Sequence, residues 1–223
     1  MPAFPPSTKE QIVLAGERLF ARHGLDGISL RQIATAAGAG SNSAVQYHFG
    51  TKEQLIQAIF EHRLPDLHYR RSMLMAETGA GTLRDLLNCQ VLPVLEQAER
   101  PGSHYLSFVA MLAQHRHYDV FKRLPAEFLQ SAQALSEQVG AQLGHLPAAL
   151  AQLRFSRAMT LLLQAAAERE QANAEGRPAR PFRLDASDLL DCMVAILHAP
   201  ASPGSIAGIE AGQGIGLPPT LLP

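Results

Sequence analysis

Residues 41–52, SNSAVQYHFGTK, combine side chains that can read nucleobases with side chains that can bind phosphate. Asparagine and glutamine amides pair bidentately with adenine, serine pairs with several bases, and an alanine methyl group can contact the methyl group of thymine. These chemistries predict contacts with base edges from Asn42, Ser43, Ala44 and Gln46. An alternative interpretation is that Asn42 and Ser43 only satisfy the amide groups of a turn and a helix start.

The aromatic and cationic residues that follow suit the phosphate backbone. Tyr47 and His48 can reach phosphate oxygens, and such contacts position a protein on DNA without reading its sequence. His48 has the alternative of packing against its neighbour Phe49. Lys52 stands in the first turn of a predicted helix, where a cation opposes the helix dipole by roughly 0.3–1 kcal/mol. A phosphate bound at that helix start would explain its placement.

Short helices must position these side chains, and the sequence marks their starts. Three pairs fit the capping box, in which a hydroxyl residue is followed three positions later by Glu or Gln: Ser7 with Glu10, Ser29 with Gln32, and Thr51 with Gln54. The pattern predicts helices over 8–23, 29–37, 42–48 and 52–64. The middle two then form a helix-turn-helix, whose second helix enters the major groove of double-stranded DNA. Ser29, Arg31 and Ser41, near the starts of these two helices, complete the predicted DNA contacts.

The N-terminal sequence resembles the TetR family of dimeric bacterial transcriptional regulators. The resemblance runs from Thr8 to Arg63 and lies in three segments: IVLAGERLFARHG, SLRQIATAAG and YHFGTKEQL. It implies a homodimer that binds a palindromic DNA operator and is released by a small-molecule effector. It also implies that Tyr47, His48 and Lys52 contact phosphates.

The turn and the second helix depart from the family pattern in two ways. The turn AGAGSNS is one residue longer than the usual one. From Gln32 to Thr51 the sequence contains no Lys or Arg. This absence predicts an operator that is read without arginine–guanine contacts from this helix, with more A·T at the contacted steps.

The remaining sequence predicts further helices and almost no strand. Apolar residues recur at helical spacing over 66–77, 81–98, 103–115, 118–143 with a break at Pro125, 147–174 and 186–198. The predicted fold class is all-α, with a three-helix helix-turn-helix DNA-binding domain over 1–52 and a larger helical ligand-binding and dimerisation domain over 53–199. Helix 52–64 links the two domains. Residues 200–223 are rich in Gly and Pro and are expected to form a flexible tail.

Two helices of the larger domain are apolar around most of their circumference. AMTLLLQAAA, residues 158–167, is apolar nearly all round, and DLLDCMVAIL, residues 188–197, over more than half. Such helices must bury more than one face, so we expect one face in the chain's own core and another against a second copy. The predicted dimer interface contains Leu161, Leu162, Ala165, Leu189, Leu190, Met193 and Leu197. The alternative is one large core with both helices internal.

The resemblance also implies a ligand pocket in the larger domain. Its predicted lining suits an apolar or amphipathic effector and comprises Met73, Cys89, Tyr105, Phe108, Met111, Leu112, Phe121, Phe128 and Met159. For each of these residues alone, core packing is the simpler interpretation. The side chains of His115 and His117 can be interpreted as contacts to a ligand's polar group, as metal ligands or as solvated surface residues. Solvated surface residues are the simplest interpretation. Residues two apart on a helix point about 200° from each other, so shared metal ligation is not expected.

The composition excludes several classes of function. The chain has 223 residues, 47% of them apolar, and a net charge of −1 from 19 Lys and Arg against 20 Asp and Glu, so any affinity for DNA must be local. No catalytic motif or zinc-ligand spacing occurs, so we expect neither an enzyme, a metal nor a cofactor. Two distant cysteines, no signal peptide and no run of about 18 apolar residues predict a cytoplasmic protein without a membrane partner.

These patterns together predict a ligand-responsive dimeric transcriptional regulator, most simply a repressor. Two alternatives stay open. One is an architectural or cell-division factor on the same fold that binds DNA without an inducer. The other is a small-molecule carrier or helical enzyme whose front helices only resemble a DNA-binding domain, and a gel shift distinguishes it from the regulator.

Overall fold

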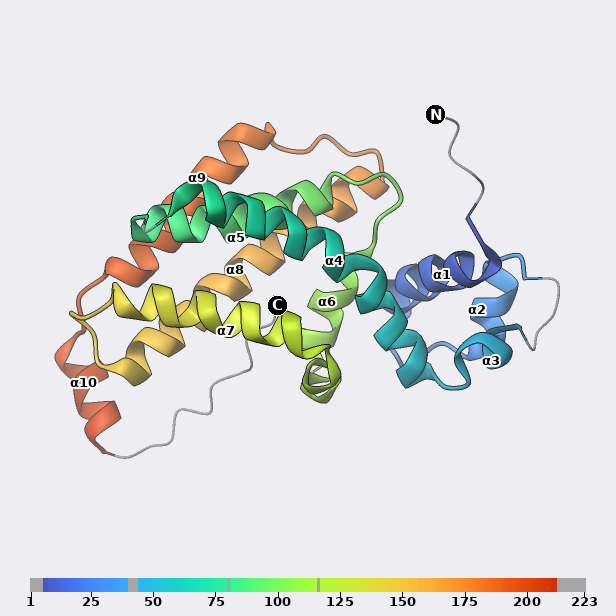
Figure 1. The fold of residues 1–223 in the computed structure, drawn as a ribbon, viewed down its shortest axis with the longest axis horizontal. Coiled ribbons are helices and arrows are strands. Elements are labelled where there is room, and N and C mark those ends of the chain that lie inside the picture. Colours follow the sequence, from blue (N-terminus) through green and yellow to red (C-terminus); the bar gives the residue numbers. More distant parts are fainter. Residues whose placement is uncertain (1–5, 40–43, 80, 116, 212–223) are drawn as a thin grey trace.

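The structure is a computed structural model that describes residues 6–39, 44–79, 81–115 and 117–211. These residues form ten α-helices, one 3₁₀ helix and no strand, which confirms the predicted all-α fold class. Figure 1 shows a small group of helices at the N-terminal end and a larger group beyond it, joined by one long helix. We name the small group, α1–α3, the head and the large group, α5–α10, the body.

The head consists of α1 (Thr8–His23), α2 (Leu30–Ala36) and α3 (Ala44–Phe49). The predicted hydroxyl caps are present in the structure. Ser29 with Gln32 and Thr51 with Gln54 form reciprocal capping boxes, and the Ser7 hydroxyl accepts a hydrogen bond from the backbone N–H of Glu10 at 3.2 Å. Gly24 ends α1 with a φ of 73°, in the left-handed region that favours glycine.

The linking helix α4 (Lys52–Thr78) is a single helix of 27 residues that runs from the head into the body (Figure 1). The sequence predicted two helices separated at Pro65, and that boundary is wrong. A proline inside a helix removes one backbone hydrogen bond and costs about 3 kcal/mol or more. Leu64 and Leu67, on either side of the proline, are 1% and 6% exposed, so packing of α4 against the core maintains the helix through this position.

The body contains α5 (Leu83–Ala98), α6 (Tyr105–Gln114), the 3₁₀ helix η1 (Tyr118–Arg123), α7 (Ala126–Ala141), α8 (Ala148–Ala174), α9 (Phe182–His198) and α10 (Pro203–Glu210). α5 packs against α4, α8 and α9, and α6 packs against both α1 and α8. The helix predicted over 118–143 divides at Pro125 as expected, but its first part is a 3₁₀ helix. α9 begins at Phe182 rather than at the predicted residue 186.

The short helix α10 corrects the prediction that the chain is irregular after residue 199. The Ser202 hydroxyl caps it by accepting a hydrogen bond from the N–H of Ser205 at 3.2 Å, and Pro203 occupies a first-turn position where no N–H is needed. Within the described residues, no single helix is long and apolar enough to cross a bilayer. α9 and α10 together meet the length and composition required, but they bend by 63° at their junction. The remainder of the predicted tail, 212–223, lies outside the described residues.

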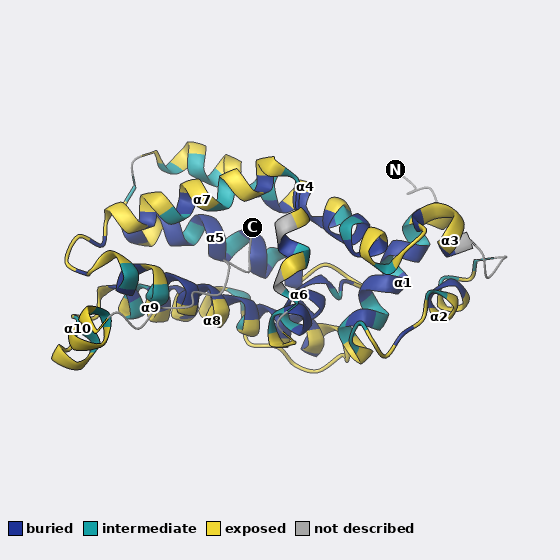
Figure 2. Ribbon diagram, turned by 90° about the horizontal axis from the view of Figure 1, so that it is seen from below, coloured by how far each residue is buried: buried dark blue, intermediate teal, exposed yellow. Residues whose placement is uncertain are grey.

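One hydrophobic cluster extends from the head into the body. Ile12, Ile33 and Val45, one from each helix of the head, are 0% exposed. Gly16 lets α1 approach α4 closely, because a Cβ atom at this position would lie 3.0 Å from Leu55 Cδ2. Figure 2 shows that the buried residues line the inner faces of the helices in both groups, so the head packs on the linking helix rather than standing apart from it.

Candidate DNA-binding surface and the junction behind it

The short helix α3 buries two side chains and exposes the three residues between them. Val45 and Phe49 are 0% and 6% exposed and pack into the hydrophobic cluster. Gln46, Tyr47 and His48 are exposed, and Tyr47 keeps 85% of its surface accessible. Two buried side chains hold the helix in place, so its exposed row is available to a partner.

The structure places part of the predicted DNA-contact set on this surface. The exposed members are Arg31 on α2 and Gln46, Tyr47 and His48 on α3. Ser29 is also exposed, but its hydroxyl is used in the cap of α2, where it donates to Gln32 Oε1 at 2.8 Å. Ala44 is the first residue of α3. Three predicted contacts lie outside the described residues: Ser41, Asn42 and Ser43.

Lys52 has a partner within the chain that the sequence did not predict. Its ammonium group donates a hydrogen bond to the backbone carbonyl of Leu25 at 2.7 Å, and the side chain is half-buried. The bond ties the α1–α2 loop to the start of α4. An internal acceptor therefore explains the cation at this helix start, which corrects the inference that a phosphate is needed there. The ammonium group keeps two further N–H donors that can bind phosphate.

A buried ion pair joins the head to the linking helix. Glu17 of α1 is 0% exposed and Arg63 of α4 is 7% exposed. The guanidinium donates two hydrogen bonds to the carboxylate, from Nε to Oε2 at 2.7 Å and from Nη2 to Oε1 at 2.9 Å. The backbone N–H of His104, directly before α6, donates to Oε1 at 2.8 Å. Charge-assisted hydrogen bonds to one carboxylate thus fix α1, α4 and the start of α6 relative to one another.

A second buried carboxylate holds the start of α6 from the side of α8. Glu170 is 1% exposed. It accepts hydrogen bonds from the N–H groups of Leu106 and Ser107 at 3.2 and 2.8 Å, and from the hydroxyls of Ser103 and Ser107 at 2.7 and 2.8 Å. These bonds supply partners that the first amides of a helix otherwise lack. Burial raises the pKa of Glu170, and the hydrogen bonds oppose that rise.

Sequence reasoning did not identify either carboxylate as important. Glu17 stands at helical spacing from Val13 and Phe20, so a charge on the apolar face of α1 was the available signal. Glu170 follows the apolar run of α8 in the same way. The partners were not predictable from spacing, because Arg63 lies far along the chain from Glu17 and meets it only in the folded protein.

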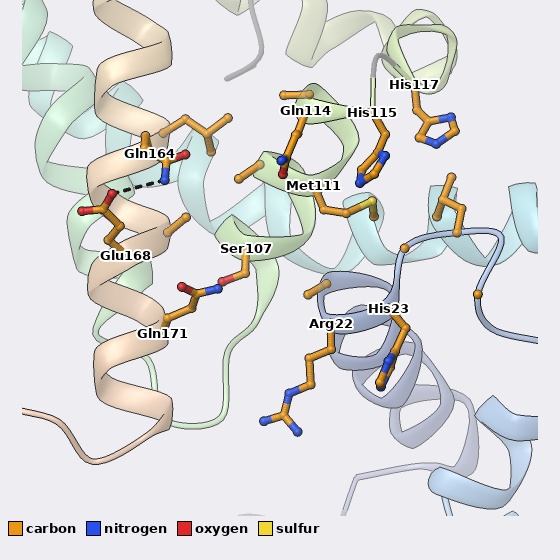
Figure 3. Close-up of a pocket in the computed structure, with 18 of the residues that line it drawn as sticks. Arg22, His23, Ser107, Met111, Gln114, His115, His117, Gln164, Glu168 and Gln171 are labelled. Atoms are coloured by element: carbon orange, nitrogen blue, oxygen red, sulfur yellow. Dashed lines mark hydrogen bonds between the residues drawn. The ribbon is translucent and has the colours of Figure 1, made fainter.

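A cleft of about 880 Å³ lies between the head and the body. The end of α1 with the loop after it, α6 with its following turn, and α8 form its walls. Figure 3 shows Arg22 and His23 on the α1 side, and His115 and His117 beyond the end of α6. On α8, the amide of Gln164 donates a hydrogen bond to Glu168 at 3.2 Å. The lining combines these polar side chains with apolar ones such as Leu25, Met111 and Leu163, so the cleft suits a small molecule that carries polar groups.

The predicted ligand-pocket residues mostly belong to the packed core. Met111 lines the cleft, and Met73 is 41% exposed on α4. The others are at most 5% exposed and line neither this cleft nor three smaller ones: Cys89, Tyr105, Phe108, Leu112, Phe121, Phe128 and Met159. Phe60 fills the space between three of the aromatic rings, with centroid distances of 6.1 Å to Tyr105, 5.7 Å to Phe108 and 5.6 Å to Phe121. The burial of these residues agrees with the core interpretation, and the pocket interpretation stays a prediction.

The predicted dimer interface needs a similar correction. Five of its members are at most 6% exposed within a single chain, so their side chains have no surface left for a partner: Leu162, Leu189, Leu190, Met193 and Leu197. Leu161 is 37% exposed and Ala165 is half-buried. The large apolar side chains that α8 and α9 leave exposed are Leu161 and Leu184. The apolar circumference of these helices is explained by packing against α5, α6 and each other.

The histidines near the end of α6 lie together but do not form a metal site with acidic residues. The rings of His115 and His117 stack with their centroids 6.2 Å apart. They are not on opposite faces of a helix, as the sequence suggested, because α6 ends at Gln114 and a turn follows. Within the described part of the chain, no group of three or more His, Cys, Asp or Glu side chains is arranged to hold a metal ion.

The head therefore has the architecture of a helix-turn-helix protein, with the second helix held by its inner face and its polar face exposed. Comparison with known sequences agrees. Residues 12–59 match the model of the bacterial regulatory proteins of the tetR family. The HTH-type transcriptional repressors AcnR of Corynebacterium efficiens and Corynebacterium glutamicum are each 36% identical to the chain over 55 residues.

The similarity to the tetR family of bacterial regulatory proteins is confined to this N-terminal domain. The similarity to the two repressors covers 25% of the chain and 29% of each repressor's length.

Proposed function

We propose that the protein is a transcriptional regulator, most simply a repressor, that binds a palindromic DNA operator as a homodimer and is released by a small molecule. The observation that carries this proposal is the exposed row Gln46, Tyr47 and His48 on α3, in a domain that matches a family of regulatory proteins. The name of the AcnR repressors supports repression rather than activation.

A homodimer provides two heads for two half-sites. Reading helices of a dimer lie about one helical turn of DNA, roughly 34–36 Å, apart. The outer faces of α8 and α9 offer a surface for pairing, with Leu161 and Leu184 exposed at 37% and 60%. Pairing there would leave the head free to contact DNA, because the head packs on α4 and α6 instead.

The junction between head and body provides a path for regulation. α4 begins at the head and continues into the body without a break, and Glu17 ties α1 to both α4 and the start of α6. A shift of α6 or α4 in the body therefore changes the position of the head. Coupling of this kind typically amounts to about 1–3 kcal/mol, or about a 5- to 150-fold change in operator affinity.

Fluorescence anisotropy of the full chain on labelled duplexes tests the DNA-binding part. The duplexes carry inverted repeats from the DNA that flanks the protein's own coding region, and a scrambled duplex serves for comparison. We expect Tyr47→Ala to weaken binding to both by about 1.5–3 kcal/mol, because it removes a hydrogen bond to a charged phosphate. Tyr69→Ala is the matched control, since Tyr69 is 66% exposed in the second half of α4, away from the head. Equal affinities of Tyr47→Ala and Tyr69→Ala would overturn the proposed surface.

A further inference from the structure

The cleft between the head and the body has two polar ends of opposite character. On the α1 side lies the cation Arg22, followed by His23, and His115 lies farther along the cleft at the end of α6 (Figure 3). Across the cleft, α8 contributes Gln164, Glu168 and Gln171 to the lining, and the carboxylate of Glu168 accepts the hydrogen bond from Gln164. Asp26, in the loop after α1, is the other acidic residue of the lining.

The arginine at this cleft differs from several arginines of α4 and the body. Arg63, Arg70 and Arg100 each form an ion pair with a carboxylate of a neighbouring element. Arg22 forms no ion pair with any residue that the structure describes, and its side chain is exposed. Its charge is nevertheless felt within the junction, because Arg22 is the main cation that lowers the pKa of His104, after burial.

The size of the cleft also fits a bound molecule. Small-molecule sites typically occupy about 300–1,000 Å³ and combine apolar surface with a few placed polar groups. The cleft has a volume of about 880 Å³, and its apolar lining includes Met111 and Leu163. A guanidinium and a carboxylate in one lining match opposite charges on one ligand, and the glutamine amides of α8 can bond to polar groups between those charges.

We infer that this cleft binds a zwitterionic small molecule of the amino-acid or short-peptide class, with its carboxylate on Arg22 and its ammonium group on Glu168. This inference rests on the proposed function for its regulatory meaning. It also replaces the apolar effector predicted from the sequence with a polar one.

Occupation of the cleft would act directly on the position of the head. Arg22 belongs to the last turn of α1, and Glu168 lies in α8 of the body, so one ligand contacts both groups of helices. Glu17 of α1 and Glu170, which lies two residues after Glu168 in α8, hold the start of α6. A ligand shifts a conformational equilibrium only by its difference in affinity for the two states. A ligand that contacts both α1 and α8 has such a difference when its fit depends on the separation of these two helices.

Triglycine is the probe, because its ends are flexible enough to adapt to the span between the two walls and its peptide groups can pair with glutamine amides. N-acetyltriglycine keeps the carboxylate and lacks the ammonium charge. Binding of each to the full chain is measured by isothermal titration calorimetry at constant ionic strength. We expect saturable binding of triglycine with one site per chain and binding of N-acetyltriglycine that is weaker by about tenfold, the loss of one charged hydrogen bond.

Three variants locate the two ends of the ligand. Arg22→Ala is expected to weaken both compounds by about tenfold, whereas Glu168→Gln weakens triglycine alone. Arg100→Ala is the control, because Arg100 is exposed in the body and pairs with Asp66 away from the cleft. Absence of saturable triglycine binding, or equal affinities of Arg22→Ala and Arg100→Ala, would overturn the site.

The regulatory role is measured separately, by operator anisotropy with and without saturating triglycine. We expect triglycine to change operator affinity by at least about fivefold, the lower end of typical allosteric coupling, and Arg22→Ala to abolish the change. A chain that binds triglycine but no DNA refutes the proposed function and leaves the ligand site standing. A chain that binds DNA equally with and without triglycine refutes the regulatory role of the cleft.

Discussion

The exposed row on α3 and the buried junction at Glu17 are both polar, but they stand in opposite relations to the fold. Tyr47 keeps 85% of its surface accessible and contacts the ring of its neighbour His48, whereas Glu17 is 0% exposed and receives hydrogen bonds from Arg63 and His104. The polar groups on α3 retain their hydrogen-bonding capacity for a partner. The carboxylate at the junction already accepts hydrogen bonds from within the protein, and these bonds position the helices.

The difference separates two kinds of mutational effect. Substitutions on the exposed face of α3 are expected to change DNA binding with little effect on folding, because surface positions usually contribute within about 0.5 kcal/mol. Substitutions at the junction are expected to change folding first, because a buried charge without its partner is strongly unfavourable. A variant that reverses either expectation would show that the two regions are not distinct.

The largest effect is expected from Glu17→Ala, which leaves the Arg63 guanidinium buried beside an alanine. Removing one member of a buried ion pair typically costs about 3–5 kcal/mol. The His104 N–H also loses its acceptor in this variant, which lowers the free energy of unfolding further. Urea unfolding followed by circular dichroism measures the decrease in the free energy of unfolding.

Glu96→Ala is a closely matched control for this prediction. Glu96 and Arg70 form the same bidentate arrangement between α4 and α5, with both distances at 2.9 Å, but their side chains are each 39% exposed. Exposed pairs of this kind contribute about 0–1 kcal/mol. If Glu17→Ala and Glu96→Ala unfold at similar urea concentrations, burial does not distinguish the junction from an ordinary surface pair.

A smaller effect, confined to binding, is expected from Gln46→Ala. Gln46 is exposed on α3, where its amide can pair with an adenine edge, and loss of a bidentate base contact typically costs about 1–3 kcal/mol of discrimination. Competition anisotropy between the operator and duplexes with one changed base pair measures this discrimination. Gln130→Ala, on the exposed face of α7, should retain it. Gln46 does not read a base if the variant loses the same affinity on every duplex.

Elements fixed by local chemistry were the ones that the sequence predicted well. The start of α2 follows from Ser29 and Gln32, and the start of α4 from Thr51 and Gln54, because each capping box is complete within four residues. Long-range packing decided the elements that were predicted wrongly. Pro65 indicated a helix boundary, but the buried neighbours Leu64 and Leu67 keep α4 continuous.

The candidate sites divide along the same line. The residues of α3 could be named as candidates from the sequence, because their types and their place in a helix-turn-helix pattern are local features, and the structure shows that Gln46, Tyr47 and His48 are exposed. The apolar circumference of α8 and α9 correctly indicated burial on several sides, but composition does not say whether the chain's own helices or a second copy provide it. The cleft was missed because Arg22, His115 and Glu168 come from three separate helices or turns and meet only through the packing of α6 between α1 and α8.

The smallest effect is expected at Glu170, where burial and several hydrogen bonds act on the carboxylate in opposite directions. Burial prevails and raises the pKa of Glu170 above its ordinary value of 4.5. Between pH 4.5 and the raised pKa the folded chain therefore binds a proton more readily than the unfolded chain, so the free energy of unfolding falls as the pH rises through this interval. Glu170→Gln cannot titrate and should lose this part of the pH dependence. Urea unfolding of both proteins at several pH values from 4 upward measures the difference, and parallel curves would mean that the hydrogen bonds at the start of α6 fully compensate the burial of the charge.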